Sequence, residues 1–490
     1  MSPVRPSRAR RTPRSVHWRL VLVLVLVGTF AAAPRAMAEN RLPDLGDAAG
    51  EALDRSAEDR LGQAFLRQIR RRLSLVDDPE VSDYIDGLGQ RIARADPERR
   101  YRFLVVDAPT VNAFAGPGGV IAVNAGLVVI TESESELAAV LAHEIAHVTQ
   151  RHLAQLIERS GLASLATLAS VFASIVIATQ NPEAGQAAIA ATAAGAQQSA
   201  LRFSREKEME ADRTGMALLH QAGFDPRAVP AFFERFQDWQ RFTSTPPEFL
   251  SSHPVTLSRI ADTRGRAEQF APRTYRESAD YPLIRAKMRV RLATKPGAMV
   301  EHFRARVSAA GRDSAEADRY GLALALMGAS RHEEASVILE ELRREFPDRP
   351  AHRAAEAQSY SALGESDRAI ELLAASLEWF PDNRALVYGY GRELVRVGRP
   401  DEAAAHLRHF QRSHDSDPAL YRLLGLAHER AGRRAASHVA LAEYHYRNGD
   451  LESAIRQLEI ALADPAIDDY HAARAQARRE ELMDERPGRS

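Results

Sequence analysis

The chain has 490 residues, too many for one ordinary hydrophobic core, so two or three domains are expected. Hydrophobic residues make up 45% of it and charged residues 27%, a balance that excludes an intrinsically disordered protein. The formal net charge is −1, but residues 1–38 hold seven of the 65 basic residues and none of the 66 acidic ones. The rest therefore has 58 basic and 66 acidic residues, a net charge of −8, which argues against a nucleic-acid partner.

Cysteine is absent from the sequence. This excludes disulfides, thiolate metal ligands and a lipidated cysteine as a membrane anchor. Any metal site must therefore be built from histidines and carboxylates.

Residues 1–38 are predicted to be a signal peptide. A basic stretch over 5–19 precedes an apolar run over 20–33, and Ala36-Met37-Ala38 supplies the small residues of a cleavage site. The alternative is an uncleaved anchor helix, although the run is shorter than the roughly 20 apolar residues of a membrane span. Under either interpretation the bulk of the chain is exported.

Residues 39–100 are predicted to be helical, because Leu61, Phe65, Ile69 and Leu73 recur at helical spacing. Two β-like runs follow, at 101–106 and 120–124, and the Gly- and Pro-rich segment 112–119 between them predicts a β-hairpin. The second run is expected to present an edge to which an extended substrate adds as a strand. A long helix is then expected to begin near 131–134 and to run well past His147.

Residues 160–200 are rich in alanine and almost free of charge. We expect a helical hairpin packed over the core of the same domain. The 19 residues from Gly161 to Thr179 carry no charge, so a membrane span or a peripheral membrane contact is the alternative.

From about residue 310 the sequence repeats with a period of 34 residues. Ala335, Ala369 and Ala403 are spaced by 34, and so are Gly364, Gly398 and Gly432. This period is typical of tetratricopeptide (TPR) repeats, whose helix pairs stack into a solenoid with a concave surface. A helical bundle without repeats is the less specific alternative.

The motif His143-Glu144-Ile145-Ala146-His147 has the HExxH pattern. On a helix, residues i and i+4 share one face, so both imidazoles can reach one metal ion while Glu144 stands beside it. The alternative is a pair of histidines that only line a core. Downstream, the segment 204–213 reads either as a solvated charged helix or as a ligand helix. In the second case, one of Glu208 and Asp212 binds the metal while the other orients a ligand histidine.

The sequences HEIAH and SREKEMEAD together resemble the M48 zinc metallopeptidases, which are gluzincins. Within that family the glycine-rich hairpin, the site and the C-terminal repeats resemble periplasmic members that carry a TPR array and act as proteases and chaperones. The resemblance covers nearly the whole chain after residue 38. It implies one Zn²⁺ per chain on His143, His147 and Glu208, with Glu144 as catalytic base. It gives Asp212 an orienting or proton-donating role and makes His253 a candidate latch ligand, the alternative being an ordinary loop histidine.

The expected fold is mainly α: an α+β gluzincin-type peptidase domain over 39–270, a linker over 271–309 and a TPR solenoid over 310–485. The resemblance implies an endopeptidase that acts on unfolded or misassembled envelope proteins, with the outer-membrane β-barrel assembly machinery as the partner of the TPR groove. Two alternatives stay open. One is a chaperone or assembly adaptor whose zinc site is usually latched; the other is a membrane-embedded protease.

Overall fold

The computed structural model describes residues 55–155, 197–240, 249, 253–310, 315–414 and 416–486. The predicted signal peptide and almost all of the alanine-rich segment 160–200, including the candidate span 161–179, lie outside these residues. Within the described ranges, no helix combines the length and the apolar character that crossing a membrane requires.

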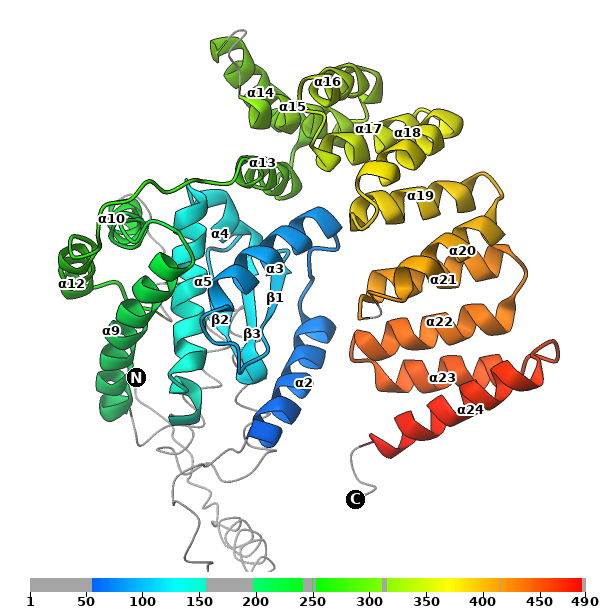
Figure 1. The fold of residues 1–490 in the computed structure, drawn as a ribbon, viewed down its shortest axis with the longest axis horizontal. Helices are drawn as coiled ribbons and strands as arrows, with labels where there is room; N and C mark the ends of the chain where they lie inside the picture. The colour runs from blue at the N-terminus through cyan, green and yellow to red at the C-terminus, as the bar shows by residue number, and fades with distance from the viewer. Residues whose placement is uncertain are drawn as a thin grey trace, which may run out of the picture. The chain divides into compact units, whose positions relative to one another are not determined.

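The described residues form a mainly helical fold with one small sheet, as expected (Figure 1). The elements of the first part, in chain order, are α2 (Arg55–Arg72), α3 (Pro79–Ala93), β1 (Arg102–Val106), β2 (Ala113–Ala115), η1 (Pro117–Gly119), β3 (Val120–Asn124), α4 (Ala125–Ile130), α5 (Glu134–Thr149), α9 (Gln197–Gln221), α10 (Ala228–Gln240) and α12 (Leu257–Ala267). Those of the second part are α13 (Tyr281–Arg291), α14 (Pro296–Ala310), α15 (Glu316–Gly328), α16 (His332–Glu345), α17 (Pro350–Ala362), α18 (Ser366–Trp379), α19 (Arg384–Arg396), α20 (Pro400–Gln411), α21 (Pro418–Arg430), α22 (Arg434–Arg447), α23 (Leu451–Leu462) and α24 (Asp469–Asp484).

The described part of the predicted N-terminal helical region, residues 55–100, contains two helices. Leu61, Phe65 and Ile69 are buried along one face of α2, and Leu73, just beyond its end, is buried as well. The helix ends after Arg72, and α3 starts anew where the Asp78 side chain accepts hydrogen bonds from two backbone N–H groups. A capping carboxylate satisfies N–H groups that the first turn leaves without partners.

The sheet differs from the predicted hairpin. Its strand order is β1-β3-β2, with β1 parallel to β3 and β2 antiparallel to β3. The hairpin therefore joins β2 to β3, because the segment before the glycine-proline turn is itself a short strand that the turn signal obscured. Since β3 is paired on both sides, the expectation that it offers an edge to a substrate strand is wrong, and β2 is the outer strand on that side.

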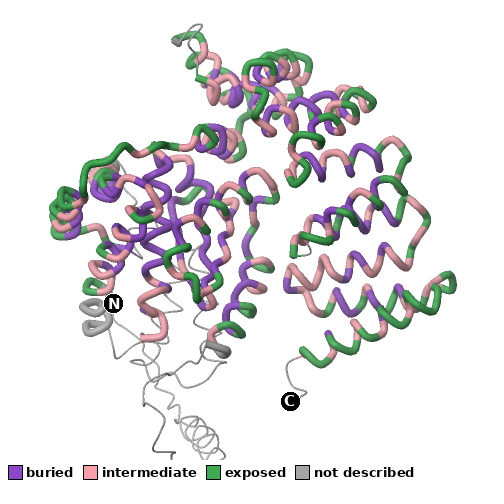
Figure 2. The backbone as a smooth tube through the Cα atoms, in the orientation of Figure 1, coloured by how far each residue is buried: buried purple, intermediate pink, exposed green. Residues whose placement is uncertain are grey.

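Helix α5 carries the HExxH motif and begins where expected, with Ser133 accepting a hydrogen bond from the Glu136 N–H. It is buried almost throughout, between the sheet and α9 (Figure 2). The expectation that it runs well past His147 is wrong. It ends at Thr149, and Arg151 has a φ of 54°, which breaks the helical path before residues 152–155 resume it.

Helix α9 packs against α5 and crosses it at an angle (Figure 1). At the crossing, a Cβ placed on Gly215 would lie 3.2 Å from the Ala142 carbonyl group and from the His143 Cα. Glycine therefore permits an approach that a larger residue would push apart. This approach brings the α9 carboxylates within reach of the α5 histidines.

The expected linker 271–309 contains two helices, α13 and α14. Residues Tyr281, Ile284 and Met288 of α13 belong to the core around the sheet and α5, whereas Leu283 and Ala286 belong to the core around α15 and α16. The hydroxyl of Tyr281 also donates a hydrogen bond of 2.8 Å to the Thr131 carbonyl oxygen. This segment is thus a packed part of the fold rather than an irregular connection.

Helices α15 to α24 pack each against the next, as a repeat array requires (Figure 1). The periodic residues have a shared environment: Ala335, Ala369 and Ala403 each have 0% of their surface exposed. Gly364, Gly398 and Gly432 have φ values of 82°, 80° and 74° at the turns between helices, a conformation that glycine adopts without strain. The predicted helical repeat is confirmed.

Candidate metal centre

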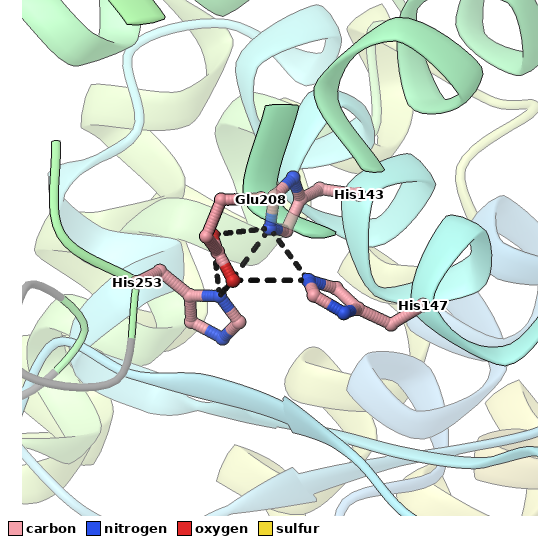
Figure 3. Close-up of side chains that lie close together, drawn as sticks. All are labelled: His143, His147, Glu208 and His253. Atoms are coloured by element: carbon pink, nitrogen blue, oxygen red, sulfur yellow. Dashed lines mark hydrogen bonds and ion pairs between the residues drawn. The ribbon is translucent and has the colours of Figure 1, made fainter. Parts of the chain in front are cut away.

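Four candidate ligand side chains converge from three parts of the chain (Figure 3). His143 and His147 lie one turn apart on α5, Glu208 comes from α9, and His253 precedes α12. One ligand atom from each lies within 4.8 Å of all the others. The structure thus brings together all three predicted ligands and the candidate latch residue.

The spacing of the ligand atoms matches a small tetrahedral cation. His143 Nε2 lies 3.0 Å from His147 Nε2, 3.3 Å from Glu208 Oε2 and 3.3 Å from His253 Nδ1. Glu208 Oε1 lies 3.4 Å from His147 Nε2 and 3.1 Å from His253 Nδ1. Bonds of about 2.0–2.1 Å from a central ion to nitrogen or oxygen ligands imply tetrahedral edges of about 3.3–3.4 Å. These separations are close to the edges of a tetrahedral site, so the chemistry and spacing of the donors suit a small metal ion.

The charges at the site also favour a divalent cation. Glu144, Glu208 and Asp212 are three buried carboxylates, and Arg259 is the buried guanidinium among them. With the imidazoles neutral, as they are when they bind a metal, the sum is −3 + 1 = −2. Burial by itself would lower the pKa of His143, but hydrogen bonds and charges from Asp212 and Glu208 raise it to about 10. The site thus attracts positive charge strongly, and a divalent cation balances the sum.

Asp212 holds His143 from the side away from the cluster. Its Oδ1 lies 3.0 Å from His143 Nδ1, which leaves Nε2 directed at the other ligands. Such a carboxylate fixes the tautomer and the orientation of a ligand histidine. Burial opposes the charged form of Asp212, yet hydrogen bonds from His143 and Arg259 keep its pKa below the usual range.

Arg259 joins the two acidic residues of α9. Its guanidinium donates two hydrogen bonds of 2.7 Å to the Asp212 carboxylate and lies 3.0 Å from Glu208 Oε2. A planar guanidinium suits this two-point contact, and its charge offsets the burial of the carboxylates. Sequence reasoning did not find Arg259, because no local spacing connects it to α9.

Glu144, the predicted general base, is buried beside the cluster with 1% of its surface exposed. Its Oε1 lies 3.4 Å from His253 Nε2 and makes no hydrogen bond within the described part of the chain. A buried carboxylate oxygen without a donor has capacity to accept a proton from a substrate or a water.

His253 is held in place from the sheet side. Its N–H donates a 2.7 Å hydrogen bond to the Phe249 carbonyl, and the Phe249 N–H donates to the Val111 carbonyl at 3.0 Å. The Phe249 and His253 rings are 5.0 Å apart. His253 Nδ1 consequently lies at the fourth corner of the cluster, next to both Glu208 and His143.

His152 is a second residue that sequence reasoning missed. Its Nδ1 lies 2.9 Å from Nδ1 of His147, on the side of that ring opposite the cluster, and its Nε2 lies 3.4 Å from Glu210. The signal in the sequence is a third histidine five residues after His147. Helical spacing alone would place it on another face, and only the break at Arg151 returns it to His147.

Two family profiles match the chain. Residues 77–267 match peptidase family M48, and residues 361–427 match the tetratricopeptide repeat. The first range contains every residue of the cluster and its neighbours, and the second lies within the helical repeats.

Whole-length relatives also match. The beta-barrel assembly-enhancing protease of Escherichia coli (strain K12) is 31% identical over 96% of this chain and 97% of its own. The putative beta-barrel assembly-enhancing protease of Vibrio cholerae is 35% identical over 92% of this chain and 94% of its own. The mitochondrial metalloendopeptidase OMA1 of Schizosaccharomyces pombe is 33% identical over 37% of this chain and 50% of its own. The expected resemblance to M48 proteases with a TPR array is confirmed.

Proposed function

Since the chain belongs to peptidase family M48 and is a metallopeptidase, we propose that its metal is zinc, bound once per chain by His143, His147 and Glu208. Two imidazoles and one carboxylate at tetrahedral spacing are the ligand set of catalytic zinc. Asp212 keeps the His143 ring in the tautomer that turns Nε2 toward the metal.

When bound, zinc polarises the scissile carbonyl and makes a water acidic enough to act near pH 7. Glu144 accepts the proton of that water at its free Oε1 and then delivers it to the leaving amine. The buried position of Glu144 keeps this carboxylate away from bulk solvent. Arg259 holds Asp212 and Glu208 in place while charge shifts at the site.

We assign His253 the role of a latch. The observation that supports it is the place of Nδ1 at the fourth corner of the cluster, 3.1 Å from either Glu208 oxygen. A catalytic zinc site needs an open fourth position, whereas four protein ligands make a closed one. Proteolysis then requires His253 to move away.

The biological role that we propose is cleavage of unfolded or misassembled envelope proteins in the periplasm. It is supported by whole-length similarity to proteins named for enhancing β-barrel assembly and by the TPR array, which suits binding of other proteins. We further propose that the TPR array contacts the outer-membrane β-barrel assembly machinery.

A second role, as an assembly adaptor whose site is usually latched, is favoured by the same fourth-corner position of His253. In the adaptor role the repeats would promote assembly without cleavage. One molecule could perform both roles, as an adaptor while His253 is in place and as a protease once it moves away.

The test compares wild type, Glu144→Gln and Glu208→Ala. Elemental analysis should find about one zinc in wild type and in Glu144→Gln, and little in Glu208→Ala, because only the last removes a ligand. Cleavage of an unfolded outer-membrane protein should fall by about 10²–10⁴-fold in Glu144→Gln, the size of a general-base contribution. A Glu144→Gln variant that cleaves at the wild-type rate would contradict the mechanism.

The same variants separate the two roles in cells. Envelope assembly that Glu144→Gln supports as well as wild type would assign assembly to the adaptor role, and assembly that fails with Glu144→Gln would assign it to proteolysis. His253→Ala should raise cleavage if the latch closes the site, whereas unchanged or lower cleavage would contradict the latch.

A further inference from the structure

The C-terminal repeats form a large open cavity apart from the metal centre. It has a volume of about 900 Å³ and is lined by residues of α20 to α24, so we call it the α20–α24 groove. Its floor is apolar and includes Ala435, Val439, Ala466 and Ile467, which all keep part of their surface accessible. A cavity of this size holds several side chains of a bound peptide.

Guanidinium groups surround this apolar floor. Six arginines line the groove against three acidic residues (Glu443, Asp464 and Asp468), an excess of 6 − 3 = 3 positive charges. The arginines are Arg408, Arg433, Arg434, Arg447, Arg474 and Arg478.

Half of these arginines already have acidic partners. Arg433 pairs with Asp401, and Arg447 and Arg478 both pair with Glu443. Arg408, Arg434 and Arg474 form no ion pair with any described residue, and all three are exposed. The excess of positive charge is therefore available to a ligand.

His428, in the wall of the groove, has arginines as its charged neighbours. Its Nδ1 accepts a 3.0 Å hydrogen bond from Arg433 Nε. Burial, followed by the charges of Arg433 and Arg408, lowers its pKa to about 4. The two arginines thus add to the effect of burial in the direction that the excess of guanidinium groups in the groove predicts.

We propose that the α20–α24 groove binds an extended segment of a partner protein in which carboxylates alternate with apolar side chains. The carboxylates meet Arg408, Arg434 and Arg474, and the apolar side chains cover the floor. Arginine suits this role because its planar fork binds a carboxylate at two points. The inference rests on the proposed role of the TPR array in recruiting proteins and names the chemistry that it recruits.

The test measures peptide binding to the full chain by fluorescence anisotropy. The background is Glu144→Gln in every sample, so that peptides are not cut. One labelled probe alternates leucine with aspartate, and the matched probe replaces each aspartate with asparagine. The aspartate probe should bind about tenfold more tightly or better, and this difference should shrink as salt rises to about 0.3 M.

Two triple variants locate the binding. The groove triple combines Arg408→Gln, Arg434→Gln and Arg474→Gln. It should lower the affinity for the aspartate probe by about tenfold or more. The control, Arg344→Gln with Arg368→Gln and Arg399→Gln, removes the same charge from exposed arginines outside the groove and should leave binding within about twofold. Equal weakening by both triples, or equal binding of both probes, would overturn the proposal.

Two further outcomes are decisive. If the groove triple fails to fold, Arg474→Gln alone, on an exposed position of α24, must still weaken the aspartate probe. Binding that appears only after deletion of residues 39–54, which hold five acidic residues and one arginine, would assign the groove to the chain's own segment and overturn the partner proposal.

Failure here leaves the peptidase proposal intact. Zinc content and the loss of cleavage in Glu144→Gln do not depend on this groove, so they report separately on the metal centre.

Discussion

His143 in the peptidase region and His428 in the TPR region are both buried, but opposite charges surround them. Asp212 and Glu208 contact the ring of His143, and despite burial they raise its pKa to about 10. At His428, burial and then Arg433 and Arg408 lower the pKa to about 4. The same residue type therefore has a raised pKa among carboxylates in one region and a pKa lowered by burial and then by arginines in the other. The sign of the neighbours, rather than burial, distinguishes the two sites.

The largest effect that this comparison predicts is at Arg259. Arg259→Met leaves Asp212 buried without its cationic partner, so the free energy of unfolding should fall by about 3–5 kcal/mol. Urea unfolding in the presence of a chelator measures this loss. The control is Arg213→Met, which breaks a partly exposed pair with Asp262 and should cost less than about 1 kcal/mol. Equal losses of unfolding free energy in the two variants would mean that the buried charge pair at the centre stabilises the fold no more than an exposed pair does.

The next effect concerns His152, which lies 2.9 Å from the outer nitrogen of His147. His152→Ala should weaken zinc binding by about 10–100-fold, because the orientation of His147 is no longer fixed. Competition with a zinc indicator measures the affinity. His220→Ala removes a histidine that contacts Tyr275, apart from the cluster, and should leave the affinity unchanged. An unchanged zinc affinity in His152→Ala would show that His152 does not orient His147.

In the TPR region, small residues rather than charges set the packing. Ala369→Leu places extra methyl and methylene groups where α18 has no free space and should destabilise the protein by about 1–3 kcal/mol. Ala375→Leu, at an exposed position of the same helix, should change stability by less than about 0.5 kcal/mol. Thermal melting distinguishes them. Zinc content should stay the same in both, and its loss in Ala369→Leu would show that the two regions are coupled more tightly than we expect.

The smallest effect is a pH dependence at His428. Its folded pKa of about 4 lies below the usual value of 6.5, so the unfolded chain takes up the proton first as the pH falls. Stability is thus fully present above pH 6.5 and is lost progressively as the pH falls from 6.5 toward 4. His428→Gln should melt with a shallower decline over that window, whereas His409→Gln, at an exposed position, should follow wild type. If stability falls with pH as steeply in His428→Gln as in wild type, His428 is not a source of acid sensitivity.

The fold could be predicted from the sequence where periodicity is local. The 34-residue repeat and the buried face of α2 at Leu61, Phe65 and Ile69 follow from spacing alone, and both are confirmed. Strand pairing could not be predicted in the same way, because β2 has only three residues and precedes a strong turn signal. Pairing of β1 with β3 joins residues separated by a further strand, which no local pattern reveals.

For the candidate site, the sequence predicts which residues lie together on one face of a single helix. The i and i+4 positions of His143 and His147, and those of Glu208 and Asp212, place each pair on one face of its helix. His253 was singled out through the family resemblance alone. Arg259 and His152 depend on how α12 docks on α9 and on a broken helix at Arg151, and such tertiary features leave no spacing in the sequence.

Helix α13 has a consequence for how the molecule is divided. Tyr281, Ile284 and Met288 complete one core, while Leu283 and Ala286 complete the next. A peptidase fragment that stops at residue 270 would lose part of its own interior and expose apolar surface in its place. The peptidase and TPR regions therefore cannot be separated between residues 270 and 281 without loss of core packing. A fusion that joins this peptidase to another protein would have to keep α13.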